Sequence, residues 1–331
     1  MSKLKLTCAC WNYDRTRSLM DGAVQVDGID LNYLNLPVEE TFFRMIRNRE
    51  FDVAEMSLSS YTVSTFRDPQ PFIAIPIFPS RMFRHSSIYI NADAGIREPQ
   101  DLIGKRIGTP EFQMTAPVWI RGILAEHYGV PLDSVTYVTG GEEEPGRIEK
   151  QKLDLPPSIR IEPIGAEQTL SQMLATGEIA ALHTARMPST FLSQPDRVKR
   201  LFPDFVDVER KYYRETGIFP IMHTVVIRRE VYEQNRWVAQ SLYKAFAEAQ
   251  RNTYEDLYVT AALKGMLPWL TAHVEETRAL MGDDYWPYGF DANRQTLATF
   301  LRYHHQQGLS KTLRTPEELF APETMEAAFK I

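Results

Sequence analysis

Alternation of short β-type runs with helical apolar periods is the feature that most constrains the fold of this chain. KLKLTCA (3–9) and IDLNYLNL (29–36) have the composition of strands, and Val38, Phe42 and Ile46 of VEETFFRMIRN (38–48) fall on one helical stripe. Another β-type run, FDVAEMSL (51–58), follows directly. Strand, helix and strand in this order are typical of an α/β fold.

The same pattern begins again in the middle of the chain. KRIGT (105–109) leads into a helical period that ends at Gly129, and SVTYVTGG (134–141) precedes a second helical segment that stops at Gly177. After Gly217 one strongly β-type run remains, and the rest of the chain has helical periods. At 331 residues the chain has room for two lobes, each with its own core.

Composition excludes several classes of protein. With 44% hydrophobic residues, 24% charged residues and a net charge of -6, the chain resembles a soluble globular protein and not a nucleic-acid-binding one. No apolar run approaches the roughly 20 residues that cross a membrane. The first residues, MSKLKLTCACWNYD, lack the apolar core of a signal peptide, so we expect a cytoplasmic protein. Cys8 and Cys10 are too few for a zinc site, which needs about four ligands.

Six segments, taken in order, carry a family resemblance. They are DVAEMSLSSY, IPIFPSRMFRHSSIYI, LIGKRIGTPEFQMTAPVWIRGILAEHYGV, VTGGEEEPGR, LATGEIAALHTARMP and FPIMHTVVIRREVY. Together they resemble the 4,5-dihydroxyphthalate decarboxylase family. The resemblance implies a two-lobed α/β fold like that of periplasmic binding proteins of type II, with two crossing hinge strands and a helical C-terminal tail. We expect lobe 1 to comprise residues 1–87 and 222–331, and lobe 2 to comprise residues 88–221.

The resemblance also implies an activity. It is the non-oxidative decarboxylation of 4,5-dihydroxyphthalate, or a close hydroxylated phthalate, to protocatechuate and carbon dioxide. The ring would be protonated while arginines in the interlobe cleft hold the carboxylates. No organic cofactor is implied, and although a divalent metal would polarise a catechol, no H-E-x-x-H or similar spacing supports one.

Candidate binding residues follow the predicted strands, because ligands of such sheets bind at the carboxyl ends of strands. Arginine suits carboxylates, since its planar donor fork stays charged. The serines are expected to hydrogen-bond the ligand and the aromatic residues to stack on its ring. Glu111 and Gln113 are expected to receive its hydroxyls, and the backbone N–H groups of the helix start at Thr115 to hold a second anionic oxygen. Surface pairing, helix capping and ordinary packing remain the alternatives for these side chains. The predicted set is Arg81, Arg84, Arg186, Arg147, Ser57, Ser59, Ser60, Trp11, Tyr13, Phe83, Glu111, Gln113 and Thr115.

Three histidines are the candidates for proton transfer: His85, His223 and His183. An unperturbed imidazole has a pKa of about 6.5 and therefore serves as acid or base near neutral pH. His85 leads because it shares a short segment with two arginines.

Two other functions stay open at this stage. One is a non-catalytic solute-binding protein that delivers an aromatic acid to a transporter, and the other is a binding-protein-like biosynthetic enzyme. In each case the expected partner is a small molecule, for the decarboxylase an aromatic dicarboxylate, with no nucleic acid and no membrane. The sequence is compatible with a homo-oligomer and does not fix the ring substitution of the substrate.

Overall fold

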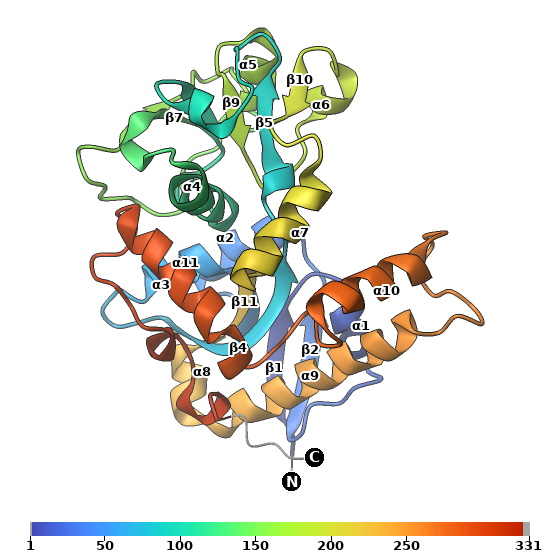
Figure 1. The fold of residues 1–331 in the computed structure, drawn as a ribbon. Helices are drawn as coiled ribbons and strands as arrows, with labels where there is room; N and C mark the ends of the chain where they lie inside the picture. Colours follow the sequence, from blue (N-terminus) through green and yellow to red (C-terminus); the bar gives the residue numbers. More distant parts are fainter. Residues whose placement is uncertain (1, 327–331) are drawn as a thin grey trace. The chain divides into compact units, whose positions relative to one another are not determined.

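The computed structural model describes residues 2–326, and these form two compact units (Figure 1). Unit 1 contains residues 2–81, 221–297 and 315–326, and unit 2 contains residues 82–220 and 298–314. The division differs from the expected lobes mainly at 298–314, which group with unit 2. The reason is packing: the ring of Tyr303 covers Gly122, and Phe300 lies 5.5 Å from Trp119 between ring centroids.

Unit 1 is built on a five-stranded sheet with the order β2-β1-β3-β11-β4. Its strands are β1 (Leu4–Ala9), β2 (Ile29–Leu34), β3 (Val53–Ser57), β4 (Phe72–Arg81) and β11 (Ile221–Arg228). β1 runs parallel to both β2 and β3, whereas β11 runs antiparallel to β3 and β4. The strand that returns from unit 2 is therefore inserted between β3 and β4.

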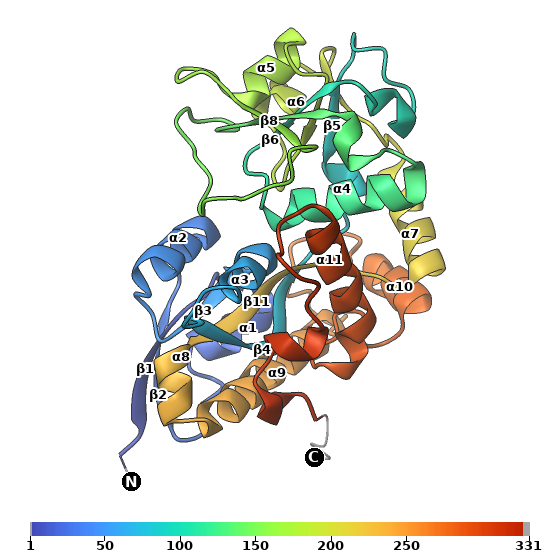
Figure 2. The ribbon, with the colours of Figure 1, turned by 90° about the vertical axis from the view of Figure 1, so that its left-hand side faces the viewer.

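Helices cover both faces of this sheet. The helices of unit 1 are α1 (Asp14–Met20), α2 (Val38–Asn48), α3 (Leu58–Ser64), α8 (Arg229–Gln234), α9 (Trp237–Leu257) and α10 (Leu270–Met281), of which α10 packs on α9. The unit also has the short turns η4 (Asp291–Asn293), η5 (Pro316–Leu319) and η6 (Pro322–Thr324). Val238, Leu242 and Phe246 of α9 pack with Val53 and Val225 of the sheet. Helices α2 and α3 lie on the opposite face (Figure 2).

Unit 2 has a six-stranded sheet with the order β10-β5-β9-β6-β7-β8. Its strands are β5 (Ile88–Asn91), β6 (Arg106–Thr109), β7 (Thr136–Thr139), β8 (Arg160–Pro163), β9 (Ala181–His183) and β10 (Val198–Arg200). Its helices and turns are η1 (His85–Ser87), η2 (Pro99–Leu102), α4 (Thr115–Tyr128), η3 (Leu132–Ser134), α5 (Leu170–Thr176), α6 (Ser189–Ser193), α7 (Phe205–Thr216) and most of α11 (Arg294–Gln306). Parallel pairing joins β9, β6, β7 and β8, so the carboxyl ends of these strands share one edge.

Glycines end two helices of unit 2 where the sequence predicts it. Gly129 caps α4 with φ 65°, and Gly177 caps α5 with φ 83°. Both angles lie in the left-handed region, which costs glycine little because it has no Cβ. After Gly129 the turn η3 leads to β7, and after Gly177 the chain continues to β9.

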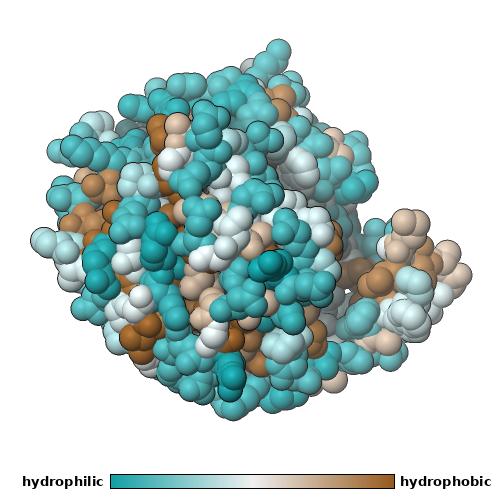
Figure 3. Space-filling model, turned by 90° about the horizontal axis from the view of Figure 1, so that it is seen from above, coloured by the Kyte–Doolittle hydropathy of each residue, from teal (hydrophilic) through white to brown (hydrophobic). Residues whose placement is uncertain are grey.

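The stretch between α9 and α10 exposes an unusual share of hydrophobic side chains. Figure 3 shows it as a projection on the right with brown and beige atoms. The exposed residues are Tyr258, Val259, Leu263, Met266, Leu267 and Trp269. Among the helices of residues 2–326, none is long and apolar enough to cross a membrane.

Candidate active site

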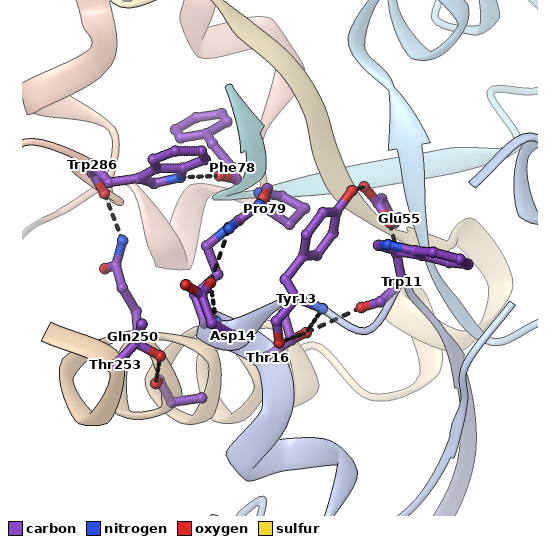
Figure 4. A network of polar contacts seen from close by, with 12 residues as sticks. Trp11, Tyr13, Asp14, Thr16, Glu55, Phe78, Pro79, Gln250, Thr253 and Trp286 are labelled. Carbon is purple, nitrogen blue, oxygen red and sulfur yellow. Dashed lines mark hydrogen bonds and ion pairs between the residues drawn. The ribbon is translucent and has the colours of Figure 1, made fainter. Parts of the chain in front are cut away.

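A buried carboxylate in the central strand of unit 1 organises the candidate active site. Glu55 lies in β3, and its side chain is 0% exposed. Its Oε1 accepts hydrogen bonds from the Tyr13 hydroxyl and from Nδ1 of His223, both at 2.6 Å. Its Oε2 accepts the backbone N–H of Trp11 at 3.1 Å (Figure 4). Short hydrogen bonds to an ionised carboxylate are stronger than neutral ones, so this cluster is tightly held.

The strand register explains why these residues meet. Val225 of β11 is paired with Glu55, and His223, two residues away, is paired with Ser57. Residues two apart on a strand share a face, so His223 and Glu55 form a diagonal cross-strand pair. On the other side of β3, Cys8 of β1 is paired with Val53. That register brings the end of β1, followed by Trp11 and Tyr13, to the carboxylate.

Electrostatics keep the Glu55 carboxylate ionised. Burial by itself would raise the pKa of Glu55, but attraction to His223 and the hydrogen bonds from His223, Tyr13 and Trp11 outweigh it and hold the pKa below the ordinary 4.5. The pKa of the Tyr13 hydroxyl is raised, first by burial and then by the Glu55 charge. Tyr13 is therefore a neutral donor to the carboxylate.

His223 has one nitrogen engaged and one available. Its Nδ1 donates to Glu55, while its Nε2 makes no hydrogen bond to any residue between 2 and 326. The side chain is 16% exposed, and the ring of Phe42 packs edge-on against it at 4.9 Å between centroids. A buried carboxylate behind an accessible imidazole fixes the tautomer and stabilises the protonated ring, which is the arrangement of a general acid or base.

Predicted site residues of unit 1 lie around this pair. Trp11 is 40% exposed beside Glu55, and its indole is available to an aromatic ligand. Ser57 is paired with His223, and its Oγ accepts the backbone N–H of Ser60 at 3.5 Å as the N-cap of α3, while Ser59 is buried. Trp11 and Ser57 thus lie beside Glu55 and His223, and the serines also have the capping and buried positions that packing alone would give.

Arg81 occupies a different position. It lies at the end of β4, is buried, and its Nη2 donates to the backbone oxygen of Pro287 at 2.7 Å and to the side chain of Asn293. These bonds tie β4 to the segment that precedes α11. The contacts are those of a structural residue.

The other residues of the segment 81–90 belong to unit 2. His85 is enclosed by the rings of Tyr128, Phe202 and Tyr212, and neither of its nitrogens has a hydrogen-bond partner within residues 2–326. Burial, and then the charge of His127, lower the pKa of His85 to about 4. An imidazole in such surroundings is neutral near pH 7 and has the setting of a core residue.

Arg84 and Phe83 also pack within unit 2. Arg84 is buried, and its Nη1 lies 3.4 Å from both Ser87 Oγ and the Ala185 oxygen. Burial lowers the pKa of Arg84 to about 10. Phe83 stacks on Phe219 with 4.6 Å between centroids. The sequence placed Arg81, Arg84 and His85 in one group, but the structure divides them between two units.

A second polar cluster lies at the carboxyl ends of β6 and β7 in unit 2. The Glu111 carboxylate is 0% exposed and binds Arg147 at 2.6 Å and the Lys150 ammonium. Gln113 accepts a hydrogen bond from Gln151 at 3.4 Å, and Thr115 begins α4. The loop after β7 is thus held down by the loop after β6.

Two carboxyl groups in these loops have raised pKa values. Burial raises the pKa of Glu149, whose Oε1 accepts the Phe112 N–H, to about 7. Burial likewise raises the pKa of Glu142, which is bonded to the Thr184 hydroxyl, to about 7. Either group would exchange a proton near neutral pH.

His183 and Arg186 follow β9 in the same unit. His183 is buried without a hydrogen-bond partner in the described part of the chain, and burial, with the charge of Arg121, lowers its pKa to about 3. Arg186 is exposed, and its backbone N–H donates to Thr184 Oγ1 at 3.1 Å. Of the three candidate histidines, only His223 combines a charged partner with an accessible nitrogen.

Sequence reasoning missed Glu55 and Arg15. A single acidic residue within the β-type run VAEMS was a usable signal, because an unpaired charge is rarely buried in a central strand. For Arg15, which stacks on the Tyr13 ring at 4.1 Å, no sequence pattern gave an indication. Among residues 2–326, no group of three or more His, Cys, Asp or Glu side chains is placed to hold a metal ion.

Comparison with solved structures shows the fold. A putative periplasmic sulfonate-binding protein from Methylobacillus flagellatus superposes with a TM-score of 0.57 at 12% identity, covering 97% of this chain and 92% of that one. The periplasmic aliphatic sulphonate-binding protein from Escherichia coli gives 0.54 at 11% identity, covering 98% and 99%. The predicted two-lobed, periplasmic-binding-protein-like α/β fold is confirmed.

Comparison with characterised sequences shows the family. No family model matches the chain. A 4,5-dihydroxyphthalate decarboxylase from Comamonas testosteroni is 44% identical over 331 residues, which is the full length of both chains. A 4,5-dihydroxyphthalate decarboxylase from Pseudomonas putida is 47% identical over 214 residues, covering 65% of this chain and 83% of that one. The chain therefore belongs to the 4,5-dihydroxyphthalate decarboxylase family.

Proposed function

We propose that the protein decarboxylates 4,5-dihydroxyphthalate to protocatechuate and carbon dioxide, with His223 as the proton donor and Glu55 as its partner. Two relatives carry the name of this activity. The observation that supports the assignment of the proton donor is the 2.6 Å contact between Nδ1 of a partly exposed His223 and a fully buried Glu55 carboxylate. It is the only one of the three candidate histidines, all of which lie in the described part of the chain, with such a partner.

The chemistry requires a proton at the ring carbon that loses its carboxylate. In this substrate each such carbon lies para to a hydroxyl, whose electrons stabilise the ring when that carbon is protonated. Nε2 of protonated His223 gives its proton to the carbon, and a C–H bond forms. The C–C bond to the carboxylate then breaks, its electron pair restores the aromatic ring, and carbon dioxide leaves. His223 regains a proton from solvent, so one proton is consumed for each carbon dioxide released.

The other residues of the cluster position the reacting groups. Glu55 remains ionised and stabilises the protonated imidazole, and Tyr13 fixes the carboxylate by donating to the same oxygen as His223. Trp11 offers an exposed indole on which the substrate ring stacks, a contact worth about 0.5–1.5 kcal/mol beyond area burial. His85 and His183 have no proton-transfer role in this proposal, because burial holds both in the neutral form.

Two further parts of the proposal concern cofactor and location. The reaction as written needs no organic cofactor, and activity should survive chelation of divalent metals. A cytoplasmic location is also proposed, and cell fractionation would test it.

The test is carbon dioxide release from 4,5-dihydroxyphthalate by the purified protein, with and without EDTA, with protocatechuate measured in parallel. We expect equal amounts of the two products in both conditions. Binding of the substrate without release of carbon dioxide would instead favour a solute-binding protein. Activity abolished by EDTA and restored by a divalent metal would refute the metal-independent mechanism.

A further inference from the structure

Arg15 lies one side chain away from the Glu55–His223 pair. Its guanidinium carbon is 4.1 Å from the centroid of the Tyr13 ring and 4.3 Å from a ring centroid of Trp286. The hydroxyl of that same Tyr13 is bonded to Glu55 Oε1, which also binds His223. A cation is therefore held beside the proton-transfer pair with only Tyr13 between them.

The surroundings of Arg15 are fixed by several hydrogen bonds. The Trp286 indole donates to the Phe78 oxygen at 2.9 Å, and the backbone oxygen of Trp286 accepts from Gln250 at 2.6 Å (Figure 4). Nε of Arg15 donates to the Pro79 oxygen at 2.5 Å. Aromatic rings near the guanidinium and a backbone oxygen on one edge leave few orientations to this side chain.

The remaining edge of the guanidinium is partly available. Nη1 contacts the Asp14 carboxylate at 3.0 Å, and that carboxylate is 59% exposed. Nη2 makes no hydrogen bond to any described residue, and the Arg15 side chain is 16% exposed. Exposed ion pairs between neighbouring residues contribute little, so Asp14 competes weakly with a better-placed anion.

We propose that Arg15 binds the carboxylate that the substrate keeps, and that it thereby selects benzoic acids with a carboxylate adjacent to the reacting carbon. This inference rests on the proposed function. Arginine binds a carboxylate through two parallel N–H bonds, and a guanidinium restrained by aromatic contacts loses little entropy on binding. The leaving carboxylate would then face His223, and the retained one would face Arg15. Arg81 is unsuited to this role because it is buried and its Nη2 is bonded to Pro287 and Asn293, whereas Arg15 is partly exposed and its Nη2 makes no hydrogen bond to a described residue.

The experiment measures carboxylate binding separately from catalysis by using two ligands that do not react. Protocatechuate carries the retained carboxylate, and catechol has the same hydroxyls without it. Calorimetric titration would measure both affinities in the wild type, Arg15→Gln and Arg15→Lys. Arg17→Gln is the matched control, because Arg17 is exposed on the same helix.

We expect Arg15→Gln to weaken protocatechuate binding by about 10- to 100-fold while catechol affinity changes by less than about threefold, because only a carboxylate uses the guanidinium fork. The loss of protocatechuate affinity in Arg15→Lys should be smaller than in Arg15→Gln, since lysine keeps the charge but lacks the planar pair of N–H donors. Arg17→Gln should leave both affinities unchanged. An unchanged ratio of the two affinities in Arg15→Gln would overturn the proposal, and so would equal losses for both ligands.

The outcome is independent of turnover. If the protein releases no carbon dioxide but its preference for protocatechuate over catechol depends on Arg15, the proposed function is wrong and carboxylate binding by Arg15 is still supported. If turnover is normal and this preference does not depend on Arg15, only the proposal that Arg15 binds the retained carboxylate is wrong.

Discussion

Replacing Glu55 by glutamine is the most informative single change to the candidate active site. The amide keeps the size of the side chain but removes the charge that stabilises protonated His223. Hydrogen bonds to charged groups contribute about 1.5–3 kcal/mol, and each 1.36 kcal/mol is a factor of ten in rate. We therefore expect kcat to fall by about 10- to 150-fold.

The assay is carbon dioxide release at saturating substrate between pH 5 and 9. Glu50→Gln is a suitable control, because that carboxylate is 40% exposed and pairs with Arg44 away from the cluster. A Glu55→Gln protein with wild-type kcat would refute the assignment of Glu55 as the partner of His223.

The same substitution predicts a change in acid stability. The folded-state pKa of Glu55 lies below 4.5, so between these values the unfolded state binds more protons than the folded one. The stabilisation is fully present above pH 4.5 and is lost as the pH falls through the folded pKa. Urea unfolding at several pH values should show a shallower loss of stability below pH 4.5 in Glu55→Gln than in the wild type, and equal slopes would contradict the pKa shift.

Three further predictions concern unit 2. Glu149→Gln should raise the unfolding free energy at pH 8 by an amount on the order of 2 kcal/mol, because the folded pKa of about 7 exceeds the unfolded value and ionisation of the buried carboxyl costs stability. This gain should shrink toward pH 5, where the carboxyl is protonated in the folded protein. A gain that is the same at both pH values would argue against the raised pKa. Lys150→Met should destabilise the fold by about 3 kcal/mol in urea titrations, because it removes a cation from buried Glu111. Lys152→Met, at an exposed position, is the control and should have little effect. Equal losses of stability in the two variants would show that the ion pair between Lys150 and Glu111 is unimportant. His85→Phe should leave kcat within about threefold of the wild type, since an aromatic ring suits its enclosure, and a loss of about 100-fold would restore His85 as a catalytic candidate.

The regular elements of the fold could be read from the sequence where apolar periodicity was strong. Helix α2 has the predicted bounds, 38–48, and Phe42 and Ile46 of its predicted stripe are buried, while Val38 at its start is half-buried. The spacing of Thr315, Pro316 and Glu318 predicts a capping box that starts a helix. The box is present, but it begins only the short 3-10 turn η5. Elements without a buried stripe gave no signal: β8 (Arg160–Pro163) has no fully buried residue, and α7 (Phe205–Thr216) buries only Tyr212.

The candidate site could be predicted only in part, because its central contact is long-range. Trp11, Tyr13 and Ser57 were found because they follow strands, and His223 was found for the same reason. Nothing local to the sequence shows that β11 returns between β3 and β4 and sets His223 diagonally opposite Glu55. The weight given to His85 came from its neighbours in sequence, whereas its surroundings in space are aromatic rings from elsewhere in the chain.

The most direct test of the account is the turnover of His223→Asn. The asparagine amide nitrogen can replace Nδ1 in the hydrogen bond to Glu55, so the variant removes Nε2 while the cluster stays intact. General acids typically contribute about 10²–10⁴-fold, so carbon dioxide release from saturating 4,5-dihydroxyphthalate should fall by that factor while protocatechuate affinity and the unfolding curve stay close to those of the wild type. A His223→Asn protein that releases carbon dioxide within about threefold of the wild-type rate would contradict proton transfer by His223 and, with it, the proposed mechanism.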